Sequence, residues 1–394
     1  MTANEKSLPL HRLVFAAPGP PRRTALPGGS PAWHFTRYDD VRQVLAEDRF
    51  TRALLPATAA SPLTGSPDAM TKQDGDGHLR LRRTVKGLLT PRGVGRLTPM
   101  VAEVTDRLVA GLAEHGPPAD LVDHYTRPLP IAVMNKLLGV HDIDETRLLR
   151  WTELAFPDPS ASSAPSAPSD EPAEAAREFT EFATRLMADR RRTPGPDLIS
   201  TLVQAADREG GIPESQLVHF VSTLVVAGYD TTMTVLGNSL LYLLDERPAD
   251  WARLGSDEAA AGVLAERLTH LIPLNDPAKH FNPLRATEDL EIGGVTVRAG
   301  DLVTLDRGAA NRDPAAFPGD PFADLFAPLE HPTLAFGGGQ HYCLGVSLAR
   351  TELRLALHRL AARLPGLRLT VPVDAVEWRT SALTRSPRHL PVTW

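Results

Sequence analysis

Apolar residues recur at helical spacing along four long stretches of the chain. Apolar side chains that fall three and four positions apart form one face of a helix, which can then pack against a core. Polar residues occupy most of the intervening positions. The predicted helices cover Met100 to Leu112, Ala175 to Met187, Val218 to Leu244 and Val346 to Leu364.

Strand patterns are fewer and shorter. Residues Leu290 to Val297 surround the pair Gly293-Gly294, which predicts a β-hairpin with a tight turn. Leu302 to Leu305 is a second short apolar run typical of a strand. The chain is therefore predicted to be mainly α-helical with small β-sheets, a fold of the α+β class.

The most biased segment, PDPSASSAPSAPSDEP, covers residues 157–172. Its proline, serine and alanine residues leave little to bury and interrupt a helix. The segments on either side, 144–156 and 173–191, are both amphipathic. We therefore predict a long surface loop between two helices, and prefer this interpretation to a linker between domains.

Composition limits the class of protein. The chain is 42% hydrophobic and 23% charged, as in a soluble globular protein with a sizeable core. Its length suggests roughly two to three domains, but no break or internal repeat divides it, so one domain over residues 1–394 is predicted. A net charge of −6 gives no overall reason to expect binding to nucleic acid or to a membrane. One cysteine excludes an internal disulfide, and no N-terminal apolar run is long enough for a signal peptide or anchor, so a cytoplasmic protein is predicted.

The single cysteine, Cys343, lies in the stretch FGGGQHYCLG at residues 336–345. A lone cysteine is commonly a small buried hydrophobic side chain. Here, however, four glycines surround it, and glycines let the main chain approach a bulky group closely. A helix is predicted directly after the loop, and its N-terminal amides favour a thiolate over a thiol. The pattern therefore indicates a thiolate that faces a flat cofactor.

The same stretch resembles the haem-binding loop of the cytochrome P-450 family, whose pattern is Phe-Gly-x-Gly-x-(His/Arg)-x-Cys-x-Gly. All six fixed positions match, at Phe336, Gly337, Gly339, His341, Cys343 and Gly345. The resemblance implies a cytochrome P-450 fold, a triangular helical domain that encloses haem b. It also implies that Cys343 is the proximal iron ligand and that His341 contacts a haem propionate. Thiolate ligation favours cleavage of the O–O bond.

Two other segments resemble the propionate-binding elements of the family. GHLRLRRTVKGLLTPR resembles its C helix, and places His78 and Arg82 four residues apart on one helical face; an exposed basic helix is the other interpretation. The resemblance implies that both side chains reach one propionate, and that Arg285 in FNPLRATEDLEIGGVTVRAGDLV binds the other. AANRDPAAF also fits the family layout, so the resemblance spans nearly the whole chain and puts the loop at 157–172 between the F and G helices.

The stretch AGYDTT, residues 227–232, lies inside the long helix predicted over 218–244. Gly228 and the two threonines are poor helix formers, and the glycine alone costs about 1 kcal/mol. Taken alone, an Asp-Thr pair is usually a surface feature or a helix cap. The resemblance implies that this helix crosses the distal haem face, where Ala227 and Gly228 leave room for dioxygen. It also implies that Asp230 and Thr231 deliver protons to the bound oxygen.

One motif departs from the family pattern. The family has Glu-x-x-Arg in its K helix and a second arginine in the meander, which together support the core beneath the cysteine loop. Here LAERLTHLIPL has Glu266 but Thr269 in place of the arginine, and Phe322 stands at the position of the second arginine. Loss of only one arginine would leave a buried charge unpaired. Loss of the network's cations together instead predicts that the core repacks. Arg267 is not expected to replace the arginine, since adjacent helical residues point about 100° apart. The departure bears on haem retention and stability more than on chemistry, so a working enzyme is predicted.

The resemblance implies a haem-thiolate monooxygenase that uses O2 to hydroxylate or epoxidise a hydrophobic small molecule, in natural-product biosynthesis. Its electrons would come from a ferredoxin or flavodoxin with its reductase. Arg80, Arg83 and Arg92 either form a cationic face for an acidic ferredoxin or serve solubility alone. Two other functions stay open: an oxidative-coupling, ring-forming or peroxide-driven enzyme of the same family, and a degenerate, haem-poor binding or recruitment module.

Substrate contacts are expected from the family layout alone. The residues are Val226, Tyr229, Leu274 and Leu383. The long loop at 157–172 is either a lid for a bulky substrate, such as a polyketide, terpenoid or peptide product, or a loop without a role.

Overall fold

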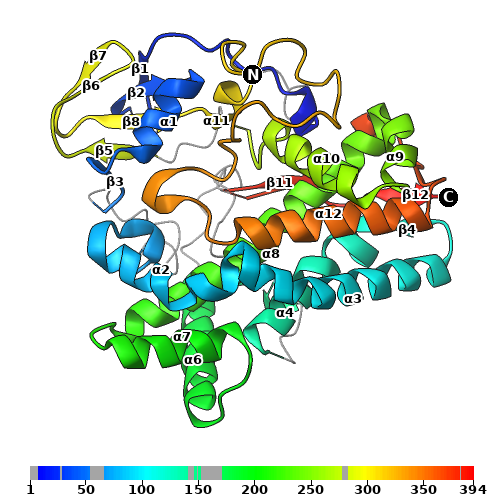
Figure 1. Ribbon diagram of the computed structural model, residues 1–394, viewed down its shortest axis with the longest axis horizontal. Coiled ribbons are helices and arrows are strands. Elements are labelled where there is room, and N and C mark those ends of the chain that lie inside the picture. Colours follow the sequence, from blue (N-terminus) through cyan, green and yellow to red (C-terminus); the bar gives the residue numbers. More distant parts are fainter. Residues whose placement is uncertain are drawn as a thin grey trace.

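The computed structural model describes residues 8–26, 29–53, 66–140, 146–148, 150–151, 171–276, 283–381 and 383–394. Helices account for most of this part of the chain, and the strands are short (Figure 1). The helices are α1 (Tyr38–Ala46), α2 (Gly75–Leu89), α3 (Pro91–His115), α4 (Pro128–Leu138), α6 (Glu171–Arg192), α7 (Leu198–Glu209), α8 (Glu214–Glu246), α9 (Pro248–Leu254), α10 (Glu258–Leu271), α11 (Arg307–Ala310) and α12 (Val346–Arg363). Short helical turns are η2 (Leu10–Arg12), η3 (Met70–Lys72), η4 (Val122–Thr126), η5 (Gly339–His341) and η6 (Val373–Ala375). The prediction of a mainly helical protein with small sheets is confirmed.

All four helices predicted from apolar spacing are present. The stretches 100–112, 175–187 and 218–244 lie inside α3, α6 and α8, and α12 begins at Val346, directly after the cysteine loop. The predicted loop at 157–172 lies outside the described residues, except that its last two positions already belong to α6.

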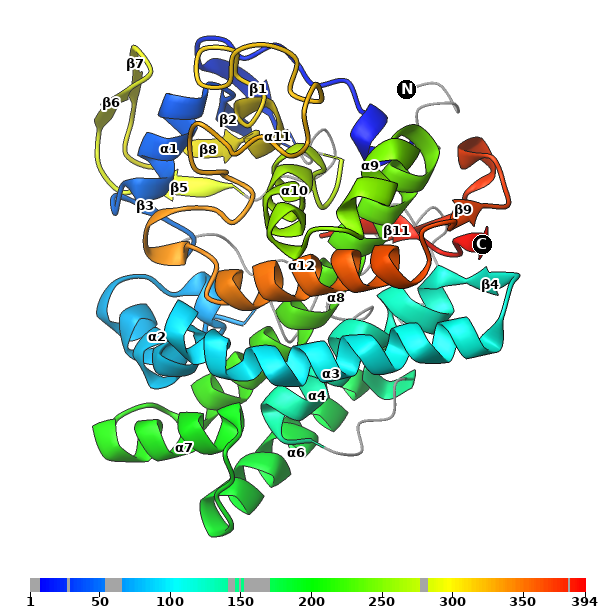
Figure 2. The same cartoon turned by 45° about the vertical axis from the view of Figure 1, so that its right-hand side comes forward.

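Helix α8 passes through the middle of the molecule in both views (Figures 1 and 2). By length and composition its 33 residues could cross a membrane, but 72% of its most apolar window is buried inside the protein. It packs against α4, α6, α9 and α12, and its two halves belong to two hydrophobic clusters. A helix that is apolar on nearly all sides is typical of such a core position. One domain over residues 1–394 stays a prediction.

The largest sheet has the strand order β1–β2–β8–β5–β3. Its strands are β1 (Arg22–Ala25), β2 (Pro31–Phe35), β3 (Phe50–Thr51), β5 (Leu284–Ala286) and β8 (Leu302–Leu305). The pair β2–β8 is parallel, and the other pairs are antiparallel. The β3–β5 pair sets Thr51 opposite Arg285 and so carries Arg285 toward the start of α2.

The predicted hairpin is formed by β6 (Leu290–Ile292) and β7 (Val295–Val297). Its turn residues Gly293 and Gly294 have φ angles of 61° and 82°, a region that strongly favours glycine. A Cβ atom on Gly293 would also lie only 2.6 Å from Cγ of Pro21. Glycine is required at this turn both for its backbone angle and for space.

The remaining strands lie near the C-terminus of the chain. β4 (Ala119–Asp120), β12 (Pro391–Thr393) and β9 (Arg368–Leu369) form one small sheet, and β10 (Trp378–Thr380) pairs with β11 (Arg385–Pro387). The β10–β11 hairpin packs along α8, where the Asn238 side chain donates a hydrogen bond to the carbonyl of Arg385 at 2.9 Å. This contact places the hairpin beside the AGYDTT segment of α8.

Candidate functional site

The cysteine loop folds back on itself before α12 begins. The backbone N–H of Cys343 donates to the carbonyl of Phe336 at 3.0 Å, and that of Gly337 donates to the carbonyl of Leu334 at 2.9 Å. The Cys343 thiol is free and partly buried. In Figures 1 and 2 the loop (orange) lies between α2 and the strands β3 and β5. The loop is thus a fixed turn that holds the thiol next to three separate elements.

The glycines of the loop serve its own folding. Gly337 and Gly339 have φ angles of 73° and 60°, which few other residues adopt. A Cβ atom on Gly339 would overlap the carbonyl oxygen of Leu45 in α1, and one on Gly338 would lie 3.0 Å from Cβ of Leu45. Gly338 and Gly339 therefore approach the end of α1 closely, and a close approach of the loop to a cofactor stays a prediction.

The protein alone does not favour a thiolate at Cys343. Burial raises the pKa of the thiol, whereas the backbone N–H of Gly345 and the charges of Arg82 and Arg350 act in the opposite direction. The N–H at the helix start thus favours the thiolate, as predicted, but burial is the larger effect. A bound metal ion displaces the thiol proton and would supply the missing stabilisation.

Two histidines meet beside the loop. The rings of His78 in α2 and His341 lie 4.3 Å apart between centroids. Nε2 of His341 hydrogen-bonds Oδ1 of Asp74 at 2.7 Å, and the Thr51 hydroxyl donates to the same carboxylate. Burial acts to raise the pKa of Asp74, but the hydrogen bonds from His341 and Thr51 outweigh it and lower that pKa to about 2. Asp74 therefore orients His341 across a wide range of pH.

Arginines surround the same place. Arg82 lies one turn after His78 and near Cys343, as the mutual influence of their charges shows. The Arg285 guanidinium donates to the carbonyl of Gly300 at 3.2 Å, and its buried Nε has no partner among the described residues. Burial lowers the pKa of Arg52 to about 10, with a further contribution from the charge of Arg307. Arg307 itself reaches the carbonyl of Ala335, just before the loop, at 3.5 Å.

This arrangement fits a haem. Buried cations are costly unless an anion balances them, and two propionates would supply that charge next to a partly accessible sulfur. His78, Arg82, His341 and Arg285, all predicted from sequence, are brought together by α2, the loop and the β3–β5 pair. Our sequence analysis missed Asp74, Arg52 and Arg307, since no local pattern marks a residue that reaches the site from another element.

One face of α8 is accessible although the helix runs through the core. Thr223, Ala227 and Thr231 follow one another four residues apart on this face, and each is partly or fully exposed. The Thr231 hydroxyl donates to the carbonyl of Ala227 at 2.6 Å. Gly228 has a packing role that we did not predict, because a Cβ atom there would lie 2.5 Å from the sulfur of Met134 in α4. The accessible face of α8 presents Ala227 and the Thr231 hydroxyl to any bound group.

Asp230 lies beside this face but is 2% exposed. One carboxylate oxygen forms an ion pair with Arg379 of β10, and the other accepts a hydrogen bond from the Thr384 hydroxyl at 2.6 Å. A surface position and a helix cap are both excluded for Asp230. Sequence reasoning could not find Arg379 and Thr384, since they are 149 and 154 residues away along the chain.

The four predicted substrate contacts divide into two pairs. Val226 and Tyr229 are 2% and 0% exposed and belong to the core around α8, and their contact with substrate stays a prediction. Both follow the helical pattern, but they point away from the accessible face. Leu274 and Leu383 lie close together, because Arg385 N donates to the carbonyl of Leu274 at 2.8 Å and the Asn275 side chain donates to that of Leu383 at 2.7 Å. Leu383 is 36% exposed.

Glu266 has a partner that the sequence did not indicate. Arg350 in α12 donates two hydrogen bonds to its carboxylate, at 2.7 and 2.6 Å. Thr269, at the position of the family's arginine, is 6% exposed, and its hydroxyl donates to the carbonyl of Ala265 at 2.8 Å. Glu266 thus has a cationic partner, Arg350, from another helix, and repacking relative to the family pattern stays a prediction.

Thr269→Arg is expected to lower the free energy of unfolding by about 1–3 kcal/mol, because a large cation would enter a filled, buried position. Urea unfolding measures the change, and Thr269→Ser serves as the size-matched control. A gain in stability would show instead that the position still accommodates an arginine.

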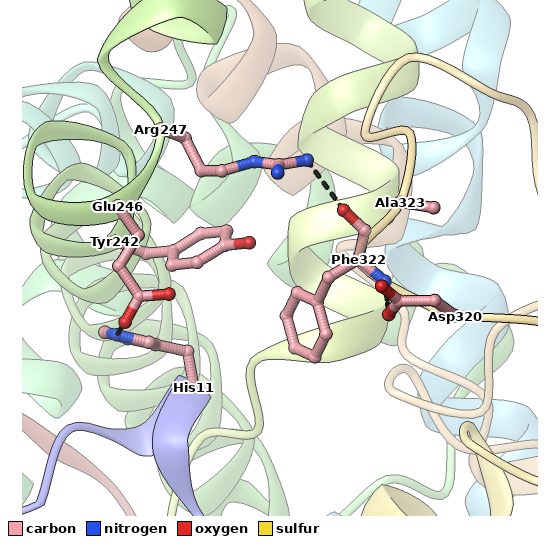
Figure 3. Close-up of a pocket in the computed structure, with 7 residues that line it drawn as sticks. All are labelled: His11, Tyr242, Glu246, Arg247, Asp320, Phe322 and Ala323. Atoms are coloured by element: carbon pink, nitrogen blue, oxygen red, sulfur yellow. Dashed lines mark hydrogen bonds and ion pairs between the residues drawn. The ribbon is translucent and has the colours of Figure 1, made fainter.

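Two arginine side chains donate hydrogen bonds to backbone carbonyls in the meander, the segment that precedes the cysteine loop. Arg267 points away from the Thr269 position, as predicted, but donates to the carbonyl of Ala327 at 3.0 Å. Phe322 packs its ring against Tyr242, with centroids 5.7 Å apart, and its carbonyl accepts from Arg247 at 2.6 Å (Figure 3). Phe322, Tyr242 and Arg247 are among the residues that line a pocket, and none of its lining residues belongs to the cysteine loop. In the meander, arginines therefore bond to neutral backbone carbonyls, where the family pattern has a network of a carboxylate and arginines.

His270 follows Thr269 and is buried without a partner for either ring nitrogen among the described residues. Burial lowers its pKa to about 3, and Arg312 and Arg267 add to the effect. Between the unfolded value of about 6.5 and about 3, the unfolded chain therefore binds a proton that the folded chain does not. Stability should be complete above pH 6.5 and fall as the pH is lowered. His11, whose pKa is lowered to about 4 chiefly by burial, acts in the same direction.

His270→Phe should therefore reduce, without abolishing, the loss of stability between pH 7 and 4. Urea-unfolding midpoints followed by tryptophan fluorescence at several pH values test this. If the unfolding midpoint changes with pH equally in the variant and the wild type, His270 is not protonated on unfolding.

Comparison with known proteins agrees with this geometry. A family model for cytochrome P450 matches residues 274–365. Nocardicin C N-oxygenase from Nocardia uniformis subsp. tsuyamanensis is 39% identical over 380 residues, which cover 95% of this chain and 92% of that protein. Mycinamicin IV hydroxylase/epoxidase from Micromonospora griseorubida is 38% identical with the same coverage.

A solved structure is similar over the same extent. The LnmA cytochrome P450 hydroxylase from the leinamycin biosynthetic pathway of Streptomyces atroolivaceus superposes with a TM-score of 0.83 at 38% identity, over 95% of this chain and 93% of that chain. Identity at this level over nearly the whole length shows that the chain belongs to the cytochrome P450 family.

Proposed function

We propose that this protein hydroxylates or epoxidises a hydrophobic small molecule of natural-product biosynthesis, with haem b as its cofactor. Family membership makes the chain a monooxygenase, and the relatives above are named as an N-oxygenase and a hydroxylase/epoxidase. We further propose one domain, a cytoplasmic location, and a ferredoxin or flavodoxin with its reductase as the electron donor.

The observation that carries the proposal is the placement of the Cys343 loop beside the His78–His341 pair and the charges of Arg82 and Arg350, together with an accessible face on the central helix. Cys343 would hold the iron, while His78, Arg82, Arg285 and His341 would bind the propionates. The haem, when bound, supplies the activation of dioxygen. The protein positions the group and controls protons around it.

Thr231 and Asp230 are proposed to supply those protons. The Thr231 hydroxyl lies on the accessible face and can exchange its bond to the Ala227 carbonyl for one to a ligand. Asp230 is held by Arg379 and Thr384, so it can pass a proton only after one of these contacts opens. Arg379 and Thr384 therefore determine when the acid is available.

The substrate is proposed to meet the tip of the β10–β11 hairpin. Leu274 and the partly exposed Leu383 provide an apolar contact there, next to the residues that hold Asp230. A ligand that moves the hairpin would thus also disturb the contacts of Asp230.

Two of the three arginines predicted to face a ferredoxin contact other residues of this chain. Arg83 lies 3.9 Å from Glu209, and Arg80 donates to the carbonyl of Gly211 at 3.3 Å, so both contact α7 or the residues after it. Arg92 is exposed. We retain an acidic ferredoxin or flavodoxin as the proposed partner, with Arg92 as the freest of the three cations.

The proposal is tested with the purified protein. The reduced, carbon-monoxide-bound form should show the Soret band of thiolate-ligated haem, and libraries of hydrophobic natural products should contain compounds that shift the haem spin state. Absence of bound haem would overturn the proposal in favour of the haem-poor binding module. Turnover with peroxide alone, or dimeric or cyclised products, would favour the peroxide-driven or coupling alternatives.

A further inference from the structure

The helix that follows the cysteine loop carries an arginine with two unusual contacts. Arg350 lies in the second turn of α12, seven residues after Cys343. Its Nε and one terminal nitrogen bind the two oxygens of Glu266 in α10, at 2.7 and 2.6 Å. This two-pronged geometry fixes the plane of the guanidinium, which a lysine could not do.

The same guanidinium contacts the cysteine loop. Its central carbon lies 5.1 Å from the centre of the Phe336 ring, within the range of a cation–π contact. Phe336 is the first residue of the loop, and its carbonyl accepts the hydrogen bond from Cys343 N at 3.0 Å. Arg350 therefore connects α10 to the residue on which the Cys343 backbone rests.

These contacts occur where the family's side-chain network is missing. Thr269 bonds only within its own helix, and Phe322 packs against Tyr242. Among the described residues, the Arg350–Glu266 pair is the ion pair that joins α10 to the start of α12 nearest the loop. The pair is partly exposed, with side chains 44% and 23% accessible. Such a pair contributes little to overall stability, so its effect should be local.

We propose that Arg350 is a positioning residue that holds the cysteine loop in the conformation needed for iron ligation, in place of the absent arginines of α10 and the meander. It acts on Cys343 through Phe336 and is itself fixed by Glu266. The inference rests on the proposed function in so far as Cys343 binds haem iron.

The chain offers a matched control. Arg354, one turn later on α12, forms an ion pair with Glu258 at the start of α10. The two pairs join the same helices, but Arg354 has no contact with the cysteine loop in the described part of the chain. Arg350→Gln and Arg354→Gln therefore remove the same kind of ion pair, with and without a link to Phe336.

The first test uses the haem-loaded protein with dithionite as reductant, so that docking of an electron-transfer partner plays no part. Haem transfer to apomyoglobin should be roughly 10- to 100-fold faster in Arg350→Gln than in the wild type, as for other residues that orient a metal ligand. The carbon-monoxide spectrum should also show more of the form without thiolate ligation. Arg350→Lys should be intermediate, and Arg354→Gln should match the wild type. Equal rates for Arg350→Gln and Arg354→Gln would overturn the proposal.

A second test needs no haem and separates this inference from the proposed function. Because Cys343 is the only cysteine, its alkylation rate in the haem-free protein, divided by the thiolate fraction measured in each variant, reports the conformation of the loop. Arg350→Gln should raise the rate several-fold, and Glu266→Gln should do the same, with the double variant no faster than either because the pair acts as a unit. Unchanged rates in both single variants would refute the positioning role, whereas failure of the wild type to bind haem would refute the proposed function alone.

Discussion

Cys343→Ser should abolish the thiolate-type carbon-monoxide spectrum and reduce monooxygenase turnover to background. A serine hydroxyl is not deprotonated as readily as a thiol, so the iron would lose its soft anionic ligand. The fold should persist, since the hydrogen bond from residue 343 to the Phe336 carbonyl uses only the backbone. We expect the free energy of unfolding of the haem-free protein to change by less than about 1 kcal/mol.

Alkylation of the single thiol provides an independent control. The haem-free wild type should be labelled at Cys343, and haem loading should protect it. Ser347→Ala, in the first turn of α12, is a comparable small change near the loop and should keep both the spectrum and the protection. A thiolate-type band in Cys343→Ser would contradict the ligand assignment.

Thr231→Ala should uncouple electron consumption from product formation. Removing the hydroxyl from the accessible face of α8 removes a proton donor at the site of oxygen binding, so electrons should leave as hydrogen peroxide. We expect the fraction of electrons recovered in product to fall by about 100-fold, the lower end of what a positioned proton donor contributes. Oxygen uptake, peroxide and product are measured together in the presence of a spin-shifting compound.

The neighbouring threonine gives the matched control. Thr232 is 5% exposed and lies in the core, so Thr232→Ala should lower stability by about 1 kcal/mol but leave coupling unchanged. Thr231→Ser should restore most of the coupling, because it keeps the hydroxyl. Normal coupling in Thr231→Ala would remove Thr231 from the mechanism.

The positions of Thr231 and Asp230 show how one helix serves two sides of the molecule. Adjacent helical residues point about 100° apart, so Thr231 faces the accessible side while Asp230 faces the β10–β11 hairpin. The hairpin supplies both Arg379 and Thr384. Proton supply and the proposed substrate contact at Leu383 thus depend on the same C-terminal segment.

The sequence by itself determined the helices and the ligand loop. Helical spacing is a local property, and it located α3, α6, α8 and α12 because apolar residues recur in each at intervals of three and four. The loop is also local, since its motif fixes residue types within ten positions. The residues proposed to bind the propionates were identified by resemblance, and the fold brings two of them, His78 and His341, together.

Only the tertiary structure decided which side chains meet across elements. Arg350 and Glu266 are 84 residues apart, and Thr384 and Asp230 are 154 apart, so neither pair leaves a local pattern. Burial also depends on neighbours: the pattern that predicts α8 does not show that Tyr229 is fully buried while Thr231 is partly exposed. Gly228 and Gly339 show the same limit. Their sequence context indicates that a side chain is excluded, but only the packed structure shows that Met134 and Leu45 exclude it.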